Sequence, residues 1–223
     1  MMLMIDPAPL SARAFHGLGV QADAYIYDET NRRMGVTDAD CERHDSRIAA
    51  LRPAACRVFV PIDVFNPSLD GETYDWHTPA AEYLRRNLRT LQAAGATVKV
   101  CMGPWTNAAM VREGMERTAV DLAVRLREEG FECVRWLCLF NEPDSIYRHE
   151  SEVYDTIWPD AKARARPPWS AYVAKNLRTL QRLDRVGLTG EVKLVVPDAV
   201  WGPAVRRERM ELAARDFADT DVS

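Results

Sequence analysis

The residues best suited to chemistry follow short apolar runs, and the clearest group is Leu139-Phe-Asn-Glu-Pro-Asp144. In it, Asn141 and Glu142 come soon after the apolar run that begins at Val134. A carboxyl group at such a place can act as a general acid or base, or it can bind a divalent cation together with a neighbour such as Asp144. The position of this segment in the fold therefore decides what Glu142 can do.

Short runs rich in β-branched residues recur along the chain and predict five β-strands. Successive runs begin roughly 35 to 60 residues apart, a spacing typical of strand–helix units with long loops. The runs are Phe15–Val20, Arg57–Ile62, Thr97–Met102, Val134–Phe140 and Val192–Val196.

Helix signals fill the intervals between these runs. Thr78-Pro79 is typical of an N-cap followed by proline at the first helical position, and Thr118 with Asp121 fits a capping box. Glycines such as Gly95 and Gly130 stand where helices would end. The expected helices begin near Thr37, Thr78, Thr118, Ser170 and Pro203.

Strict alternation of strands and helices predicts an α/β fold with a parallel sheet buried on both faces. Two architectures compete, an open doubly wound sheet and a TIM (β/α)8-type barrel. The run Phe15–Val20 contains Gly-x-Gly but lacks the third glycine and the directly following helix of a dinucleotide site. The barrel is favoured because polar residues follow every strand, as they do at the active face of barrel enzymes. These residues include Asp23, Trp105, Asn107, Asn141, Glu142, Asp198 and Trp201.

Five strand–helix units account for the 223 residues and leave an eight-stranded barrel incomplete. Eight units of this size would need roughly 350 residues, within the range of decorated barrels. We therefore expect residues 1–223 to form a single partial-barrel domain in which strands six to eight are missing. Thr220–Ser223 would begin the sixth strand. Two open sheet edges would remain, and self-association through them is expected.

The segment Asn141-Glu142-Pro143 at the end of the fourth strand resembles the acid/base motif of clan A glycoside hydrolases, the retaining (β/α)8-barrel glycosidases. Cys56-Arg-Val-Phe59 is similar to the second strand of that clan, and Gly103-Pro-Trp105 is similar to its loop after strand three. Pro197-Asp198 with Trp201 is similar to the mouth of its fifth strand. As a pattern the resemblance covers the whole chain.

The resemblance implies hydrolysis of O-glycosidic bonds by a retaining double displacement, with Glu142 as general acid/base. Asn141 would bind the 2-hydroxyl of the sugar, and Arg57 would keep the nucleophilic carboxylate ionised. In that clan the nucleophile is a glutamate at the end of strand seven, so we expect this chain alone to be inactive. The resemblance also makes Trp105, Asp198 and Trp201 substrate-binding candidates, and their positions at or after strands add Asn107 and His16.

Several of these side chains have an equally good structural interpretation. Trp105 and Trp201 could stack on a sugar or pack beneath a loop. Arg57 could pair at the surface or bind backbone carbonyls, and His16 could be a hydrogen-bonded core residue. Residue type alone does not separate these alternatives.

Other classes of protein share parts of this pattern. A magnesium-dependent sugar isomerase or lyase barrel would also place Glu142, Asp144 and Asp198 at strand ends, but it needs a lysine or histidine base there. A Schiff-base aldolase is disfavoured because Lys99 and Lys193 lie early in their strands, toward the opposite end of the sheet. A non-catalytic carbohydrate-binding or vestigial barrel would keep every candidate residue and lack only the catalytic pair.

The composition limits the kinds of partner and the cellular location that we expect. With 29 basic and 33 acidic residues the net charge is −4, so the chain carries no basic footprint for nucleic acid. No apolar run approaches the roughly 18 residues of a membrane span, and the apolar start has no basic segment of a signal peptide. The five cysteines are scattered, which favours buried reduced thiols and a cytoplasmic location. We expect a carbohydrate ligand, no cofactor and no metal.

Overall fold

The computed structural model describes residues 17–68, 71–103, 114–143, 168–198 and 203–218. Within them, five parallel strands form one sheet in which neighbours along the chain are also neighbours in space. This sequential order is that of a βα-barrel wall, and it confirms the predicted parallel α/β class. The strands are β1 (Gly19–Gln21), β2 (Ala55–Pro61), β3 (Thr97–Gly103), β4 (Val134–Cys138) and β5 (Lys193–Leu194).

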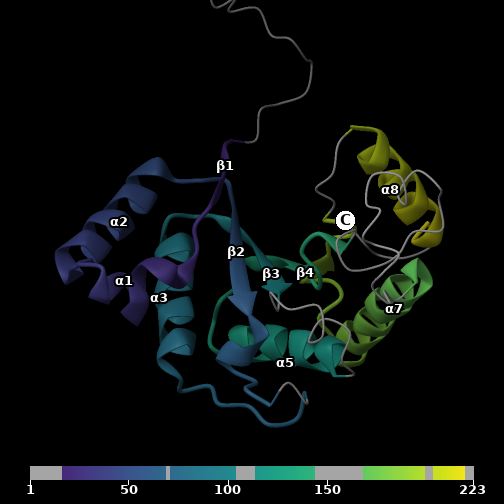
Figure 1. The fold of residues 1–223 in the computed structure, drawn as a ribbon, viewed down its shortest axis with the longest axis horizontal. Helices are drawn as coiled ribbons and strands as arrows, with labels where there is room; N and C mark the ends of the chain where they lie inside the picture. The colour runs from purple at the N-terminus through teal and green to yellow at the C-terminus, as the bar shows by residue number, and fades with distance from the viewer. Residues whose placement is uncertain (1–16, 69–70, 104–113, 144–167, 199–202, 219–223) are drawn as a thin grey trace, which may run out of the picture.

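Helical segments follow each strand. They are η1 (Ala24–Tyr27), α1 (Glu29–Arg33), α2 (Asp38–Leu51), η2 (Ile62–Val64), α3 (Pro79–Ala93), α5 (Met115–Glu128), α7 (Trp169–Arg185) and α8 (Pro203–Asp216). Figure 1 shows the long helices in an arc around the strands, with α2 and α3 at the left, α5 below, and α7 and α8 at the right. Among the described residues, no helix combines the length and the apolar character that crossing a bilayer requires.

The two faces of the sheet differ in chemistry, because successive side chains of a strand point to opposite faces. One face packs against the helices, where Val58, Val100 and Leu137 share a buried cluster with Leu88 of α3 and Leu122 of α5. The other face is called the inner face below. It carries more polar side chains than we expected of a sheet buried on both faces. It carries Gln21, Arg57, Phe59, Lys99, Cys101, Trp136 and Cys138.

Two predicted helix starts are confirmed by their caps. At the start of α2, the Thr37 hydroxyl accepts the N–H of Asp40 at 3.3 Å, and the Asp40 carboxylate accepts the N–H of Thr37 at 3.0 Å. At the start of α3, Thr78 accepts the N–H of Ala81 at 3.1 Å, and proline follows at the first helical position. Each cap satisfies N–H groups that the first helical turn leaves without a backbone partner.

Of two other predicted starts, the one at Thr118 is wrong and the one near Ser170 is one residue late. Thr118 lies inside α5, which begins at Met115 after Gly114, and its hydroxyl donates to the carbonyl oxygen of Gly114 at 3.1 Å. Ser170 lies inside α7, which begins one residue earlier at Trp169. The ring of Trp169 is buried in the main core cluster, so tertiary packing sets this helix start ahead of the serine.

β1 and β5 are the edges of the described sheet. β1 begins at Gly19, later than the predicted run Phe15–Val20, whose first two residues lie outside the described part of the chain. Both edge strands are short, with three and two residues. A short edge offers few unpaired backbone groups, and self-association through these edges stays a prediction.

Candidate active site

Asn141 and Glu142 lie just beyond β4, at the carboxyl end of the sheet. Asn141 forms an isolated parallel bridge with Asp198, and the backbone N–H of Glu142 donates to the carbonyl oxygen of Asp198 at 3.1 Å. Glu142 has a φ of 51°, in the left-handed region that residues other than glycine rarely adopt. Such a conformation costs about 1–3 kcal/mol and persists only where neighbours hold it, often at functional sites. Asp198 is the neighbour that holds it here.

The carboxylate of Asp198 lies where the charges of the inner face meet. Its Oδ1 accepts a hydrogen bond from Lys99 Nζ at 3.3 Å, and its Oδ2 lies 3.5 Å from Arg57 Nη1. Only 18% of the Asp198 side chain is exposed, so these contacts are less screened by water than those of a surface ion pair. The Asp198 carboxylate thus contacts two cations at once.

Arg57 is fixed from its other side by groups on and after β1. Its Nε and Nη2 donate to Gln21 Oε1 at 3.1 and 2.7 Å, and its guanidinium carbon lies 4.6 Å from the centre of the Phe59 ring. Asp23 in turn accepts the backbone N–H of Phe59 at 2.7 Å. Polar contacts therefore cross the inner face from β1 to the segment after β5, which orients Arg57 toward Asp198.

Two buried thiols lie beside the same carboxylate. Cys101 Sγ and Cys138 Sγ are 3.5 and 3.7 Å from Asp198 Oδ2, and Cys101 Sγ is 3.9 Å from Asn141 Oδ1. The hydrogen bond with Cys138, together with burial, raises the pKa of Cys101 well above its ordinary value. Cys101 is therefore a protonated thiol at neutral pH. All five cysteines of the chain are free, and four of them are buried.

The structure brings together the four predicted site residues that it describes. Arg57 and Asn141 both contact Asp198, and Glu142 is bound to the backbone of Asp198. Their roles in binding or catalysis stay predictions. The other predicted site residues lie outside the described part of the chain: His16, Trp105, Asn107 and Trp201.

Sequence reasoning missed the inner-face residues Lys99, Cys101 and Cys138. Lys99 does lie early in β3, as expected, but its long side chain reaches Asp198 beyond the end of β5. A signal was present in the alternation of the strands, since Arg57 and Lys99 are each followed two positions later by another residue on the same face. Reading the strands with a period of two would have placed these residues together.

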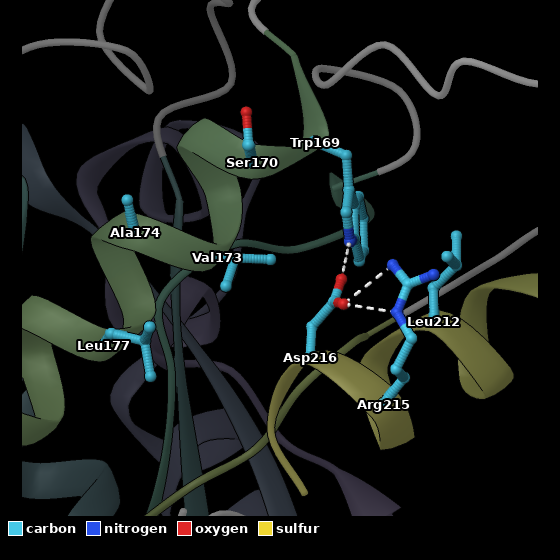
Figure 2. Close-up of a pocket in the computed structure, with 8 residues that line it drawn as sticks. All are labelled: Trp169, Ser170, Val173, Ala174, Leu177, Leu212, Arg215 and Asp216. Carbon is cyan, nitrogen blue, oxygen red and sulfur yellow. Dashed lines mark hydrogen bonds and ion pairs between the residues drawn. The ribbon is translucent and has the colours of Figure 1, made fainter.

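Two hollows of the structure are large enough to be considered as ligand sites. One, of about 390 Å³, is lined in part by Arg57, Lys99 and Trp136, and so belongs to the inner face. The other, of about 590 Å³, lies between α7 and α8, where Trp169 Nε1 donates to Asp216 Oδ2 at 3.1 Å (Figure 2). No predicted site residue lines the second hollow. The inner-face hollow meets the candidate site through Arg57 and Lys99, but Gly19 and Ala55, which begin β1 and β2, place it toward the amino end of the sheet.

No protein-family model matches the chain, and no curated protein matches it in sequence. Among the solved structures that match are three with a TM-score of 0.50. Aphid myrosinase is 12% identical, over 90% of this chain and 53% of its own. A β-glucosidase from Thermotoga maritima, in complex with methoxycarbonyl-substituted glucoimidazole, is 14% identical over 91% and 54%.

The third is GH5_18 from Bifidobacterium longum subsp. longum ATCC 55813, 12% identical over 84% of this chain and 45% of its own. The chain shares the fold of clan A glycoside hydrolases. The resemblance seen in the sequence is thereby confirmed for the fold, including the incomplete barrel. The chain spans about half the length of these structures. Since a fold hosts many activities, the activity must be argued from the site.

Proposed function

We propose that this chain supplies part of a retaining glycoside hydrolase, with Glu142 as the general acid/base. The observation that carries the proposal is the placement of Glu142 at the end of β4, in a left-handed conformation, with its N–H bound to the Asp198 carbonyl. In barrel enzymes the catalytic groups come from the carboxyl ends of several strands. The backbone hydrogen bond holds Glu142 at the end of β4 before a substrate binds, which favours proton transfer by its carboxyl group.

The reaction needs two carboxyl groups, one as the proton donor and one as the nucleophile. The Glu142 carboxylic acid gives its proton to the glycosidic oxygen as the bond to the leaving group breaks, while a second carboxylate forms a bond to the anomeric carbon. Glu142, now a carboxylate, then takes a proton from water, and that water displaces the second carboxylate with overall retention. In this proposal the Asn141 carboxamide binds a sugar hydroxyl, because its backbone pairing with Asp198 keeps it beside Glu142.

The five strands do not supply the second carboxylate, the nucleophile, which in clan A enzymes stands at the end of strand seven. Retaining glycosidases hold their two carboxyl groups about 5 to 5.5 Å apart. Asp198 already contacts Lys99 and Arg57, and it stands after β5 rather than after a seventh strand. We propose that the 223 residues by themselves do not hydrolyse glycosides, and that further strands bring the nucleophile close to Arg57.

Two alternatives remain as outcomes of the test. A non-catalytic sugar-binding barrel would use the same inner-face residues and show binding without turnover. A magnesium-dependent isomerase or lyase would use Asp198 as a metal ligand. The neighbours of Asp198 disfavour that, because two thiols and two cations surround it where magnesium prefers oxygen ligands.

The decisive experiment compares the protein from its native source with the 223-residue chain. Both are assayed against aryl glucosides, mannosides and galactosides, and the anomer released first is identified by NMR. We expect the native protein to release sugar with retained configuration. Glu142→Gln should lower its turnover of glycosides with poor leaving groups by about 10²–10⁴. Glu42→Gln, at an exposed position of α2, is the matched control and should leave turnover unchanged.

Four outcomes would count against the proposal, in whole or in part. Inverted configuration would exclude the retaining mechanism. Equal turnover in Glu142→Gln and the native protein would exclude Glu142 as the acid. Sugar binding without hydrolysis by the native protein would favour the non-catalytic alternative. Hydrolysis by the 223-residue chain, abolished by Glu142→Gln, would keep Glu142 as the acid and overturn the requirement for further strands.

A further inference from the structure

A second cluster of reactive groups lies next to the proposed acid and has no part in its chemistry. Cys101 from β3, Cys138 from β4 and Asp198 after β5 bring two sulfurs and a carboxylate oxygen within 4.8 Å of one another. The two sulfur-to-oxygen distances, from Cys101 and Cys138 to Asp198 Oδ2, are 3.5 and 3.7 Å. Both thiols are fully buried. The three groups therefore face a common point inside the protein.

The two sulfur-to-oxygen distances fit neighbouring ligands of one metal, and the two sulfurs lie within 4.8 Å of each other. In a tetrahedral zinc site, with Zn–S near 2.3 Å and Zn–O near 2.1 Å, neighbouring sulfur and oxygen ligands lie about 3.5 Å apart and two sulfurs about 3.8 Å apart. We propose that Cys101, Cys138 and Asp198 bind a thiophilic divalent metal ion such as zinc. Asn141 Oδ1 lies beside this set, 3.9 Å from Cys101 Sγ, and the proposal does not require it as a ligand.

The charged residues around the cluster can balance the charge of an occupied metal site. Two thiolates, one carboxylate and a divalent cation sum to −1, which the neighbouring cations Lys99 and Arg57 can offset. Oδ1 of Asp198 is held by Lys99, whereas Oδ2 faces the two sulfurs and also lies 3.5 Å from Arg57 Nη1, an ion pair long enough to leave a lone pair of Oδ2 for the metal.

Sulfur ligands also select among metals. Thiolates favour zinc and other soft or borderline ions over magnesium and calcium. Binding replaces two thiol protons, one from Cys101 and one from Cys138, so two protons are released for each ion bound. Metal affinity must therefore rise with pH. The expected absence of a metal, drawn from the scattered cysteines, overlooked that two of them are paired positions of adjacent strands.

A bound ion would connect three separate segments of the inner face. It would tie β3 to β4, and both to Asp198, whose backbone holds Glu142. The site would then act as a structural clamp beneath the end of the sheet. This role needs no catalysis, so it stands or falls separately from the hydrolase proposal.

Cobalt and zinc are the probes for the test. The reduced 223-residue protein is titrated with Co²⁺, which gives visible absorption bands in tetrahedral sites and a thiolate charge-transfer band in the near ultraviolet. We expect one equivalent to bind, Zn²⁺ to displace it, and zinc to raise the unfolding temperature. Cys101→Ser and Asp198→Asn should each weaken binding at least tenfold. Cys41→Ser removes a buried thiol of α2 outside the cluster and should bind as the unmodified protein does.

X-ray absorption on the zinc-loaded unmodified protein covers the case in which a cluster variant fails to fold. We expect two sulfur ligands near 2.3 Å together with lighter ligands. The proposal is overturned if no thiolate band forms, if the spectrum shows four sulfurs or none, or if Cys41→Ser weakens binding as much as Cys101→Ser.

Discussion

Glu142 and Asp198 are joined through their backbones, by a hydrogen bond of 3.1 Å from the N–H of Glu142 to the carbonyl oxygen of Asp198. The same Asp198 pairs its side chain with Lys99 and Arg57. The segment that follows β4 is therefore held by a residue whose own position depends on cations from β2 and β3. Changes at any of these strands should reach Glu142 through Asp198.

The first prediction concerns the ion pair of Lys99 and Asp198. Asp198→Asn leaves two partly buried cations without a carboxylate, so we expect the free energy of unfolding to fall by about 1–3 kcal/mol. Lys99→Met should also destabilise, and the double variant should lose less than the sum, because the unpaired charge is removed as well. Urea denaturation of all four proteins measures the coupling. Additive effects would contradict the pairing.

The second prediction concerns the left-handed backbone of Glu142. Glycine adopts this conformation without a steric penalty, so Glu142→Gly should be more stable than Glu142→Ala by about 1 kcal/mol. Arg89, exposed in the middle of α3, provides the opposite case. There glycine should be less stable than alanine by about 1 kcal/mol. The same sign at both positions, measured by thermal unfolding, would exclude the left-handed conformation.

The third prediction is a pH dependence at Glu129. Two hydrogen bonds from Arg85, at 2.7 and 2.8 Å, hold the pKa of Glu129 below its ordinary value. A lowered pKa stabilises the fold fully above the unfolded value of about 4.3, and this stabilisation is lost as the pH falls through the folded pKa. Glu129→Gln should therefore cost about 1–3 kcal/mol at pH 7.

The difference between Glu129→Gln and the unmodified protein should shrink as the pH falls below about 4.3. Urea titrations across this range measure it. Glu29→Gln is the control, because the pair of Glu29 with Arg33 is exposed and should contribute nothing measurable at any pH. A difference that stays constant as the pH falls would show that Glu129 acts by packing rather than by charge.

The fourth prediction concerns the cap of α2. Thr37 accepts the N–H of Asp40, so Thr37→Ala should cost about 1 kcal/mol, and Thr37→Ser, which keeps the hydroxyl, should cost little. Thermal unfolding of the two variants separates the hydroxyl from the side-chain volume. Equal losses in both would show that the cap contributes nothing.

The caps also show what the sequence could and could not predict. Thr37 with Asp40 and Thr118 with Asp121 have the same types at the same spacing, yet only the first pair is a cap. Thr118 is buried within α5, and Asp121 instead accepts the hydroxyl of Tyr74 at 2.6 Å. A local pattern names a possible hydrogen bond, and packing with distant residues decides whether that bond forms.

The strands and the motif were easier, because their signals are local. β-branched runs predicted every strand of the sheet, and Asn141-Glu142 was placed correctly at the end of β4. The charge network was not predicted, since Lys99 and Asp198 are 99 positions apart and nothing in either neighbourhood marks the other.

The contact of Lys99 with Asp198 has a consequence for synthesis of the chain. Proteins are made from the amino terminus, and folding begins during synthesis. Arg57 and Lys99 leave the ribosome well before Asp198 does, so a nascent sheet of three strands presents two cations with no Asp198 to pair with them. The ion pairs of Arg57 and Lys99 on the inner face can form only after Asp198 has been synthesised. Translation therefore times the closing of this network, and a pause before residue 198 would prolong the unpaired state.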